Sequence, residues 1–116
     1  MQIDIQARDF PLTEALRNHI ERRLGFALST CVTYIRRVQV RLHDINGPRG
    51  GADKCCLIQV RLDNLPDVVV KDTEADFYAA IDRAAGRAGR TVARRLTRQR
   101  TRERSLTAQA AGRTGR

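Results

Sequence analysis

Five arginines in the last third of the sequence have the side-chain type and the spacing to bind phosphate groups. Arg83, Arg87, Arg90, Arg94 and Arg98 follow one another at steps of four, three, four and four residues. Because an α-helix advances by about 100° per residue, these steps place all five guanidinium groups on one face. A planar guanidinium donates two parallel hydrogen bonds to a phosphate, which the ammonium of Lys cannot do. The spacing therefore predicts a cationic helix face that binds a polyanion.

The net charge of the chain is concentrated in the same region. The formal charge is +9 in 116 residues. Residues 1–82 carry nine Arg and two Lys against twelve Asp and Glu, a net charge of −1, whereas residues 83–116 carry eleven Arg against one Glu, a net charge of +10. GC-biased coding would also favour Arg over Lys, but it would not align the arginines on one face. The distribution is typical of a surface that binds nucleic acid.

Other residue types give no comparable signal. Three cysteines, Cys31, Cys55 and Cys56, form no CxxC pair, so the sequence favours neither a disulfide framework nor a zinc site. His43 with Cys55 and Cys56 could suggest nucleophilic chemistry, but adjacent cysteines on a strand point to opposite faces and no third orienting group is evident. We therefore expect no catalytic residues, no metal, no cofactor and no enzymatic activity. An aromatic content of 4% also disfavours RNA binding by stacked aromatic side chains.

The N-terminal residues do not have the basic-then-apolar pattern of a signal peptide. No apolar run approaches the ~20 residues that are needed to span a bilayer. We therefore expect a cytoplasmic protein with no membrane partner.

Apolar residues recur with the periods of strands and helices along the whole chain before the arginine-rich part. Alternation of apolar and polar residues predicts four strands, at residues 1–8, 35–43, 54–62 and 68–71. An apolar stripe that begins at Leu12 predicts a helix with Thr13 as its N-cap and an end near Ser29. A second stripe predicts a long helix over residues 76–102, for which Asp72, Thr73 and Asp76 are candidate caps.

The resulting order, β-α-β-β-β-α, indicates an α+β fold. A single inner face of aliphatic residues, with two amphipathic helices available, predicts a four-stranded sheet with both helices packed on one face, similar to double-stranded RNA binding domains. We expect a right-handed crossover in the first β-α-β unit and an antiparallel meander of the last three strands. A helix of ~26 residues spans about 39 Å and a strand of eight only ~27 Å, so the helix should extend past the sheet.

Two glycines interrupt the long helix and leave its extent open. Gly86 and Gly89 each weaken a helix by ~1 kcal/mol relative to alanine, so order could end near Ala88. Val92 and Leu96 keep the apolar period past both glycines and favour one continuous helix. We expect an ordered α+β domain over residues 1–102, a disordered basic tail over 103–116, and a mobile loop over the glycine-rich residues 44–53.

Two separated segments resemble a known family. Residues 1–24, MQIDIQARDFPLTEALRNHIERRL, are similar to the opening strand, turn and "TEALR" helix of the ribosome hibernation promoting factor and ribosome-associated inhibitor family, also known as the sigma-54 modulation proteins. Residues 72–96, DTEADFYAAIDRAAGRAGRTVARRL, resemble its second signature, an acidic residue and Tyr followed by Ala-Ile-Asp and a basic helix. The family's fold has the same element order.

The resemblance implies a ribosomal partner for the domain over residues 1–102. It implies binding to the 30S subunit, alone or in the 70S ribosome, in the channel for mRNA and tRNA anticodon ends, so that resting ribosomes stay inactive but protected. Family members place basic residues of the second helix against 16S ribosomal RNA, and the matching positions are Arg87, Arg90 and Arg94. Arg83 and Arg98 extend this face by periodicity alone.

The resemblance is to the short form of the family. Long-form members add a C-terminal dimerisation domain, for which this chain has no room, so we expect a monomer. Whether a separate factor dimerises ribosomes is left open, as is the inducing condition in stressed or stationary-phase cells. The basic C-terminal segment argues against the inhibitor subtype that has an acidic extension.

Several alternatives remain at this point. Arg22 and Arg23 on the first helix could widen the RNA-binding face or lie in solvent. Tyr78 and Asp82 could contact RNA, although packing and capping roles are favoured. The open sheet face is expected to be solvated rather than a second RNA site, although it bears four arginines, Arg8, Arg37, Arg41 and Arg61. Two other functions compete with ribosome binding: a general double-stranded RNA or DNA binder, and a cationic helix on anionic membranes.

Overall fold

A computed structural model describes the backbone of residues 1–45 and 53–114 and the side chains of 1–45 and 53–103. These described residues form four strands, two α-helices and one short 3₁₀ helix. Their bounds are β1 Gln2–Arg8, α1 Glu14–Ala27, η1 Ser29–Tyr34, β2 Ile35–Asp44, β3 Lys54–Leu62, β4 Val68–Glu74 and α2 Phe77–Thr114. The predicted β-α-β-β-β-α order is confirmed, with η1 as an additional element that we did not predict.

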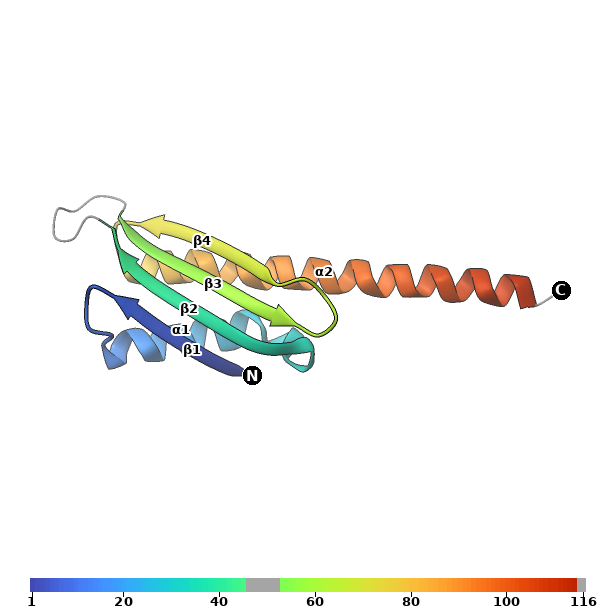
Figure 1. The fold of residues 1–116 in the computed structure, drawn as a ribbon, viewed down its shortest axis with the longest axis horizontal. Coiled ribbons are helices and arrows are strands. Elements are labelled where there is room, and N and C mark those ends of the chain that lie inside the picture. The colour runs from blue at the N-terminus through green and yellow to red at the C-terminus, as the bar shows by residue number, and fades with distance from the viewer. Residues whose placement is uncertain (46–52, 115–116) are drawn as a thin grey trace.

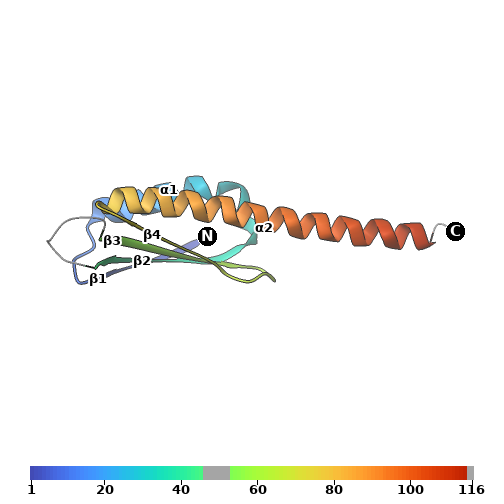
Figure 2. The same ribbon diagram turned by 90° about the horizontal axis from the view of Figure 1, so that it is seen from above.

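The strands form one mixed sheet in the order β1-β2-β3-β4. β1 pairs in parallel with β2, and β2, β3 and β4 form an antiparallel meander, as expected. Figure 1 shows the sheet in front of the helices, and Figure 2 shows that α1 and α2 lie side by side on the same face. The α+β fold with both helices on one side of the sheet is therefore confirmed, and no helix formed by residues 1–45 and 53–114 lies on the other face.

The core lies between this sheet and the two helices. Alternate residues of the strands point to the helices, and among them Val38, Val40, Ile58 and Val60 are almost completely buried. The face of α2 that packs on them consists mainly of alanine and of small aliphatic residues, namely Ala80, Ile81, Ala84, Ala85, Ala88, Val92 and Leu96. Because alanine has only one side-chain carbon, this face lets the axis of α2 come close to the sheet.

The ends of the helices agree in part with the sequence patterns. Thr13 caps α1, where its Oγ1 accepts a hydrogen bond of 3.2 Å from the Leu16 N–H. Asp76 caps α2, since its Oδ2 accepts from the Ala79 N–H at 3.3 Å. Asp72 and Thr73, the other candidate caps, belong instead to β4, which extends to Glu74 and not to Lys71 as predicted. The expected mobile loop falls largely on residues 46–52, which lie outside the described residues.

The long helix is continuous and longer than predicted. α2 passes through Gly86 and Gly89 without interruption and ends at Thr114, not near Arg102 or Ala88. Both views show that it extends well past the sheet, as the difference in length predicted (Figures 1 and 2). The backbone of residues 103–114 continues the helix, where the sequence predicted a disordered tail over 103–116, and no proline interrupts it there. The division into a binding domain at 1–102 and a separate tail stays a prediction.

Gly89 is required by the close approach of the two helices. A Cβ atom at this position would lie 2.6 Å from the carbonyl oxygen of Ala27, at the C-terminal end of α1. A Cβ atom at Gly86 would meet only the end of the Arg90 side chain, at 3.2 Å. The two glycines, which weaken the helix equally by propensity, therefore have different roles: Gly89 lets α1 and α2 pack, and Gly86 does not.

We expect opposite effects of alanine at these two glycines. Gly86→Ala should raise the free energy of unfolding by about 0.5–1 kcal/mol, because alanine favours the helix and the exposed Arg90 side chain can move. Gly89→Ala should lower it by about 1–3 kcal/mol, because the new methyl group forces α1 and α2 apart. Urea unfolding followed by circular dichroism measures both, and a Gly89→Ala protein as stable as Gly86→Ala would contradict this packing.

Candidate nucleic-acid interface

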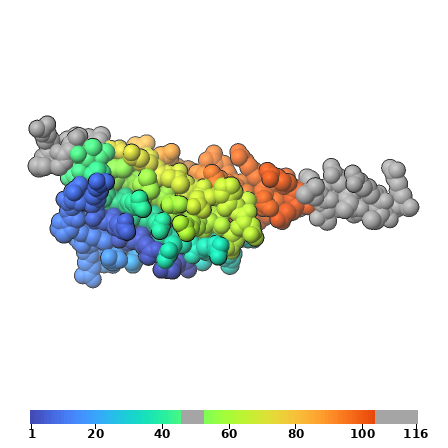
Figure 3. Space-filling model, in the orientation of Figure 1, coloured from blue at the N-terminus to red at the C-terminus, as the bar shows by residue number. Residues whose placement is uncertain are grey.

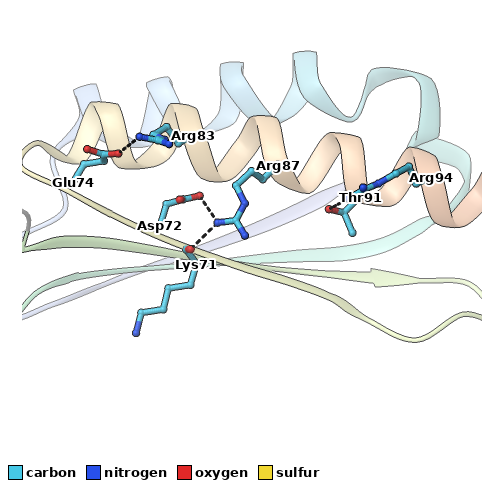
Figure 4. A network of polar contacts seen from close by, with 7 residues as sticks. All are labelled: Lys71, Asp72, Glu74, Arg83, Arg87, Thr91 and Arg94. Atoms are coloured by element: carbon cyan, nitrogen blue, oxygen red, sulfur yellow. Dashed lines mark hydrogen bonds and ion pairs between the residues drawn. The ribbon is translucent and has the colours of Figure 1, made fainter.

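The five predicted arginines lie along one side of α2, and carboxylates of β4 pair with two of them. Arg83 Nη1 lies 2.7 Å from Glu74 Oε1. Arg87 Nη1 lies 3.0 Å from Asp72 Oδ2 and donates a second hydrogen bond of 3.0 Å to the Lys71 carbonyl oxygen. Figure 4 shows both contacts, which connect the first turns of α2 to the end of β4. The positive charge of this end of the predicted face is therefore largely compensated within the protein.

The alternation of β4 explains why carboxylates meet these arginines. Val68 and Val70 point to the helices and are buried, and Asp72 and Glu74 continue the same side of the strand. The helix-facing side of β4 thus changes from apolar to acidic at its end. The alternation that places Asp72 and Glu74 on the helix side is visible in the sequence. The predicted strand ended at Lys71, so these two carboxylates were not assigned to it.

The next three arginines have no such partner. Among the described residues, no carboxylate pairs with Arg90, Arg94 or Arg98, and all three side chains are exposed. Arg94 donates a long hydrogen bond of 3.4 Å to Thr91 Oγ1, and the guanidinium of Arg90 lies over Gly86. We call these three residues the free arginine row. Since they are four residues apart, they rise along α2 by about 6 Å per step, so their charges are held at a fixed pitch.

The arginines of α1 do not join this row. Arg23 Nε lies 3.1 Å from Asp82 Oδ1, although its N–H is not aimed for a hydrogen bond, and His19 Nε2 forms a 2.7 Å contact with the same oxygen. Asp82 precedes Arg83 in the chain but faces α1 instead of β4. Arg22 is exposed and has no acidic partner among the described residues. The structure thus places Arg23 in the contact between the helices and only Arg22 in the open.

Tyr78 and Asp82 take part in contacts between the helices. The Tyr78 ring lies edge-on to His19, with ring centroids 4.9 Å apart, and Asp82 bridges to α1 as described. These contacts agree with the packing role that was favoured for the two residues.

Two further arginines, which the sequence pattern did not single out, fasten α2 where it leaves the sheet. Arg95 Nη1 donates hydrogen bonds of 2.9 Å to the Pro66 carbonyl and 2.8 Å to the Asp67 carbonyl, in the turn between β3 and β4. Arg100 lies over the Tyr34 ring, 5.4 Å from its centroid, and donates to the Tyr34 hydroxyl at 3.3 Å. The sequence indicated only that Arg95 does not belong to the predicted arginine face, and it gave no sign of the carbonyl groups that Arg95 binds.

Other chemistry finds no support in this part of the chain. Within residues 1–45 and 53–103, no group of three or more His, Cys, Asp and Glu side chains is placed to hold a metal ion. Burial raises the pKa of the Cys56 thiol to about 12, which makes it a poor nucleophile. No helix in the described ranges has the length and apolar character of a membrane span.

Comparisons with known proteins identify similar sequences and folds. The family model for sigma 54 modulation protein / S30EA ribosomal protein matches residues 3–100. The crystal structure of the Thermus thermophilus Protein Y N-terminal domain has 29% identity and a TM-score of 0.67, over 81% of this chain and 98% of that one. A ribosomal subunit interface protein from Coxiella burnetii has 18% identity and a TM-score of 0.72, over 84% of this chain and 99% of that one, and shows a shared fold. No curated protein matches the sequence.

We expect Arg95 and Arg98 to differ in their contribution to stability. Arg95→Ala should lower the free energy of unfolding by about 1 kcal/mol, because the turn between β3 and β4 loses two hydrogen bonds from a charged donor. Arg98→Ala should change it by less than about 0.5 kcal/mol, since the side chain is exposed and makes no such contact. Chemical unfolding of both variants tests this. Equal stability of the two variants would mean that the hydrogen bonds from Arg95 to the turn between β3 and β4 do not stabilise the fold.

Proposed function

The chain belongs to the sigma 54 modulation protein / S30EA ribosomal protein family, which its two motifs resemble, and we propose that it binds the small ribosomal subunit. In this proposal it contacts 16S ribosomal RNA in the channel used by mRNA and tRNA anticodon ends. Translation is then inhibited because the channel is occupied, and no bond is made or broken.

The observation that carries the proposal is the free arginine row, Arg90, Arg94 and Arg98. These exposed cations have no acidic partner in the described part of the chain, and they sit on a helix that is packed along much of its length against a sheet. A rigid support fixes the spacing of their Cα atoms before RNA is bound, so little backbone entropy is lost on binding. Such a surface recognises the arrangement of phosphates in folded RNA without reading bases.

The shape of the molecule supports the same function. α2 extends past the sheet as an arginine-rich rod, so the protein has a compact body and a narrow cationic extension (Figures 1 and 2). A rod can enter a channel between RNA segments that the body cannot enter. We propose that the body sets how deep the rod goes, and that Arg22 adds a contact from α1 while Arg23, Arg83 and Arg87 mainly hold the fold.

The proposed binding also implies where in the cell, and in what state of the cell, the protein would act. The factor would act in the cytoplasm of resting or stressed cells, where it keeps idle 30S and 70S particles inactive but intact. It would act as a monomer, and any pairing of ribosomes would depend on a separate protein.

Binding to the ribosome should depend on salt through the free arginine row. The full chain should sediment with 30S or 70S particles in the presence of excess competing duplex RNA. The neutral variant with Arg90→Gln, Arg94→Gln and Arg98→Gln should bind at least about tenfold more weakly near physiological salt. Its log–log dependence of affinity on salt should be shallower by about 2, because each lost phosphate contact removes about 0.7 from the slope.

A matched control separates the free row from the paired arginines. The double variant with Arg83→Gln and Arg87→Gln removes two arginines of the same face that already have carboxylate partners, so it should retain most of the affinity and slope. An equal loss in both variants would show that the free row has no special role. Loss of wild-type protein to the duplex competitor would reject ribosome binding in favour of a general duplex binder.

A further inference from the structure

The sheet face that no helix covers has a shallow hollow of about 670 Å³ near the ends of β1 and β2. This is the face seen in Figure 3. The side chains that line it come from all four strands and include Arg8, Arg41, His43, Cys55, Leu57 and Lys71. None of the described residues that line it is acidic, and Asp9 Oδ2 lies 3.2 Å from His43 Nε2 at its edge. The hollow therefore lies on the opposite side of the sheet from the arginines of α2 and has its own positive charge.

The cations around the hollow differ from the other cations of the same face. Arg8 and Arg41 are exposed and have no carboxylate partner among the described residues, and the Lys71 side chain points away from α2 (Figure 4). Arg37, by contrast, lies 2.9 Å from Asp4 Oδ2, and Arg61 lies 3.9 Å from Asp67 Oδ2. Among the described residues, the arginines of the open face that have no carboxylate partner thus lie at the end that has the hollow.

The floor of the hollow is apolar and its rim is cationic. Leu57 lies between Arg41 on β2 and Lys71 on β4, as the strand register shows. With neighbouring strands ~4.8 Å apart, the two cations are about 10 Å apart across the leucine. Cys55, its neighbour on β3, also faces this side but is only 6% exposed. Leu57 is half-buried, so a flat apolar group can rest on it while its charged part reaches the rim.

We propose that this hollow binds a second segment of RNA, with phosphates at Arg8, Arg41 and Lys71 and a base over Leu57. This inference rests on the proposed function, since a protein that occupies an RNA channel has RNA on both sides. The unpaired cations match a polyanion in charge, and the two arginines match phosphate in their bidentate geometry. Binding on both faces would clamp the sheet between two RNA segments, which a cationic helix alone cannot do.

The test compares two sets of neutral variants of the full chain. The hollow variant has Arg8→Gln, Arg41→Gln and Lys71→Gln, and the control variant has Arg37→Gln and Arg61→Gln, which lie on the same face but next to carboxylates. The hollow variant should bind 30S particles at least about tenfold more weakly, with a salt slope shallower by about 2, and the control should change the slope by less than about 1. Circular dichroism melts should be alike, because these side chains are at the surface.

The outcomes distinguish this inference from the proposed function. If the wild-type chain sediments with 30S particles and the hollow variant matches it in affinity and slope, the second contact does not exist and the proposed function stands. If the wild-type chain does not sediment, the proposed function fails. Binding of a single-stranded oligouridylate then tests whether the hollow binds RNA. Equal binding by the wild type and the hollow variant would overturn the inference. A photo-reactive residue at Thr73, beside Cys55, should label RNA on the particle, and labelling of a ribosomal protein alone would also overturn the inference.

Discussion

The close packing of α2 on the sheet and on α1 is the constraint on which the rest of the structure depends. The helix presents mainly alanine to the strands, and at Gly89 it comes so near the end of α1 that a Cβ atom would lie 2.6 Å from the Ala27 carbonyl oxygen. Small residues thus allow a single long helix to lie in one fixed position. Because its core face is fixed, the direction of every arginine on its other faces is fixed too.

Some arginines on this scaffold pair with groups of the protein and stabilise the fold, and others stay exposed without an acidic partner among the described residues. Arg83 and Arg87 pair with Glu74 and Asp72, and Arg95 and Arg100 hold α2 at the point where it leaves the sheet. In our proposals, the cations left for a partner among the described residues are the free arginine row, Arg22 and the rim of the hollow on the open sheet face. A high arginine content therefore overstates the number of guanidinium groups available to a partner, because several already have acceptors in the fold.

Much of the fold followed from local patterns. Alternation along β1 to β4, the cap at Thr13 and the apolar period through Val92 and Leu96 predicted the elements, because these signals arise within a few neighbouring residues. The helix end and η1 were missed. Neither has a strong local stop or start signal, since the residues after Glu103 favour a helix as much as those before it.

The sequence by itself determined the order of elements, the family motifs and an arginine period on one helix face, since each depends only on spacing along the chain. Tertiary structure alone decided which arginines are free. The acceptors of Arg87 lie 15 and 16 residues away, those of Arg95 lie 28 and 29 away, and that of Arg100 lies 66 away. Such pairs form only after the sheet and helices pack, so no local spacing can reveal them.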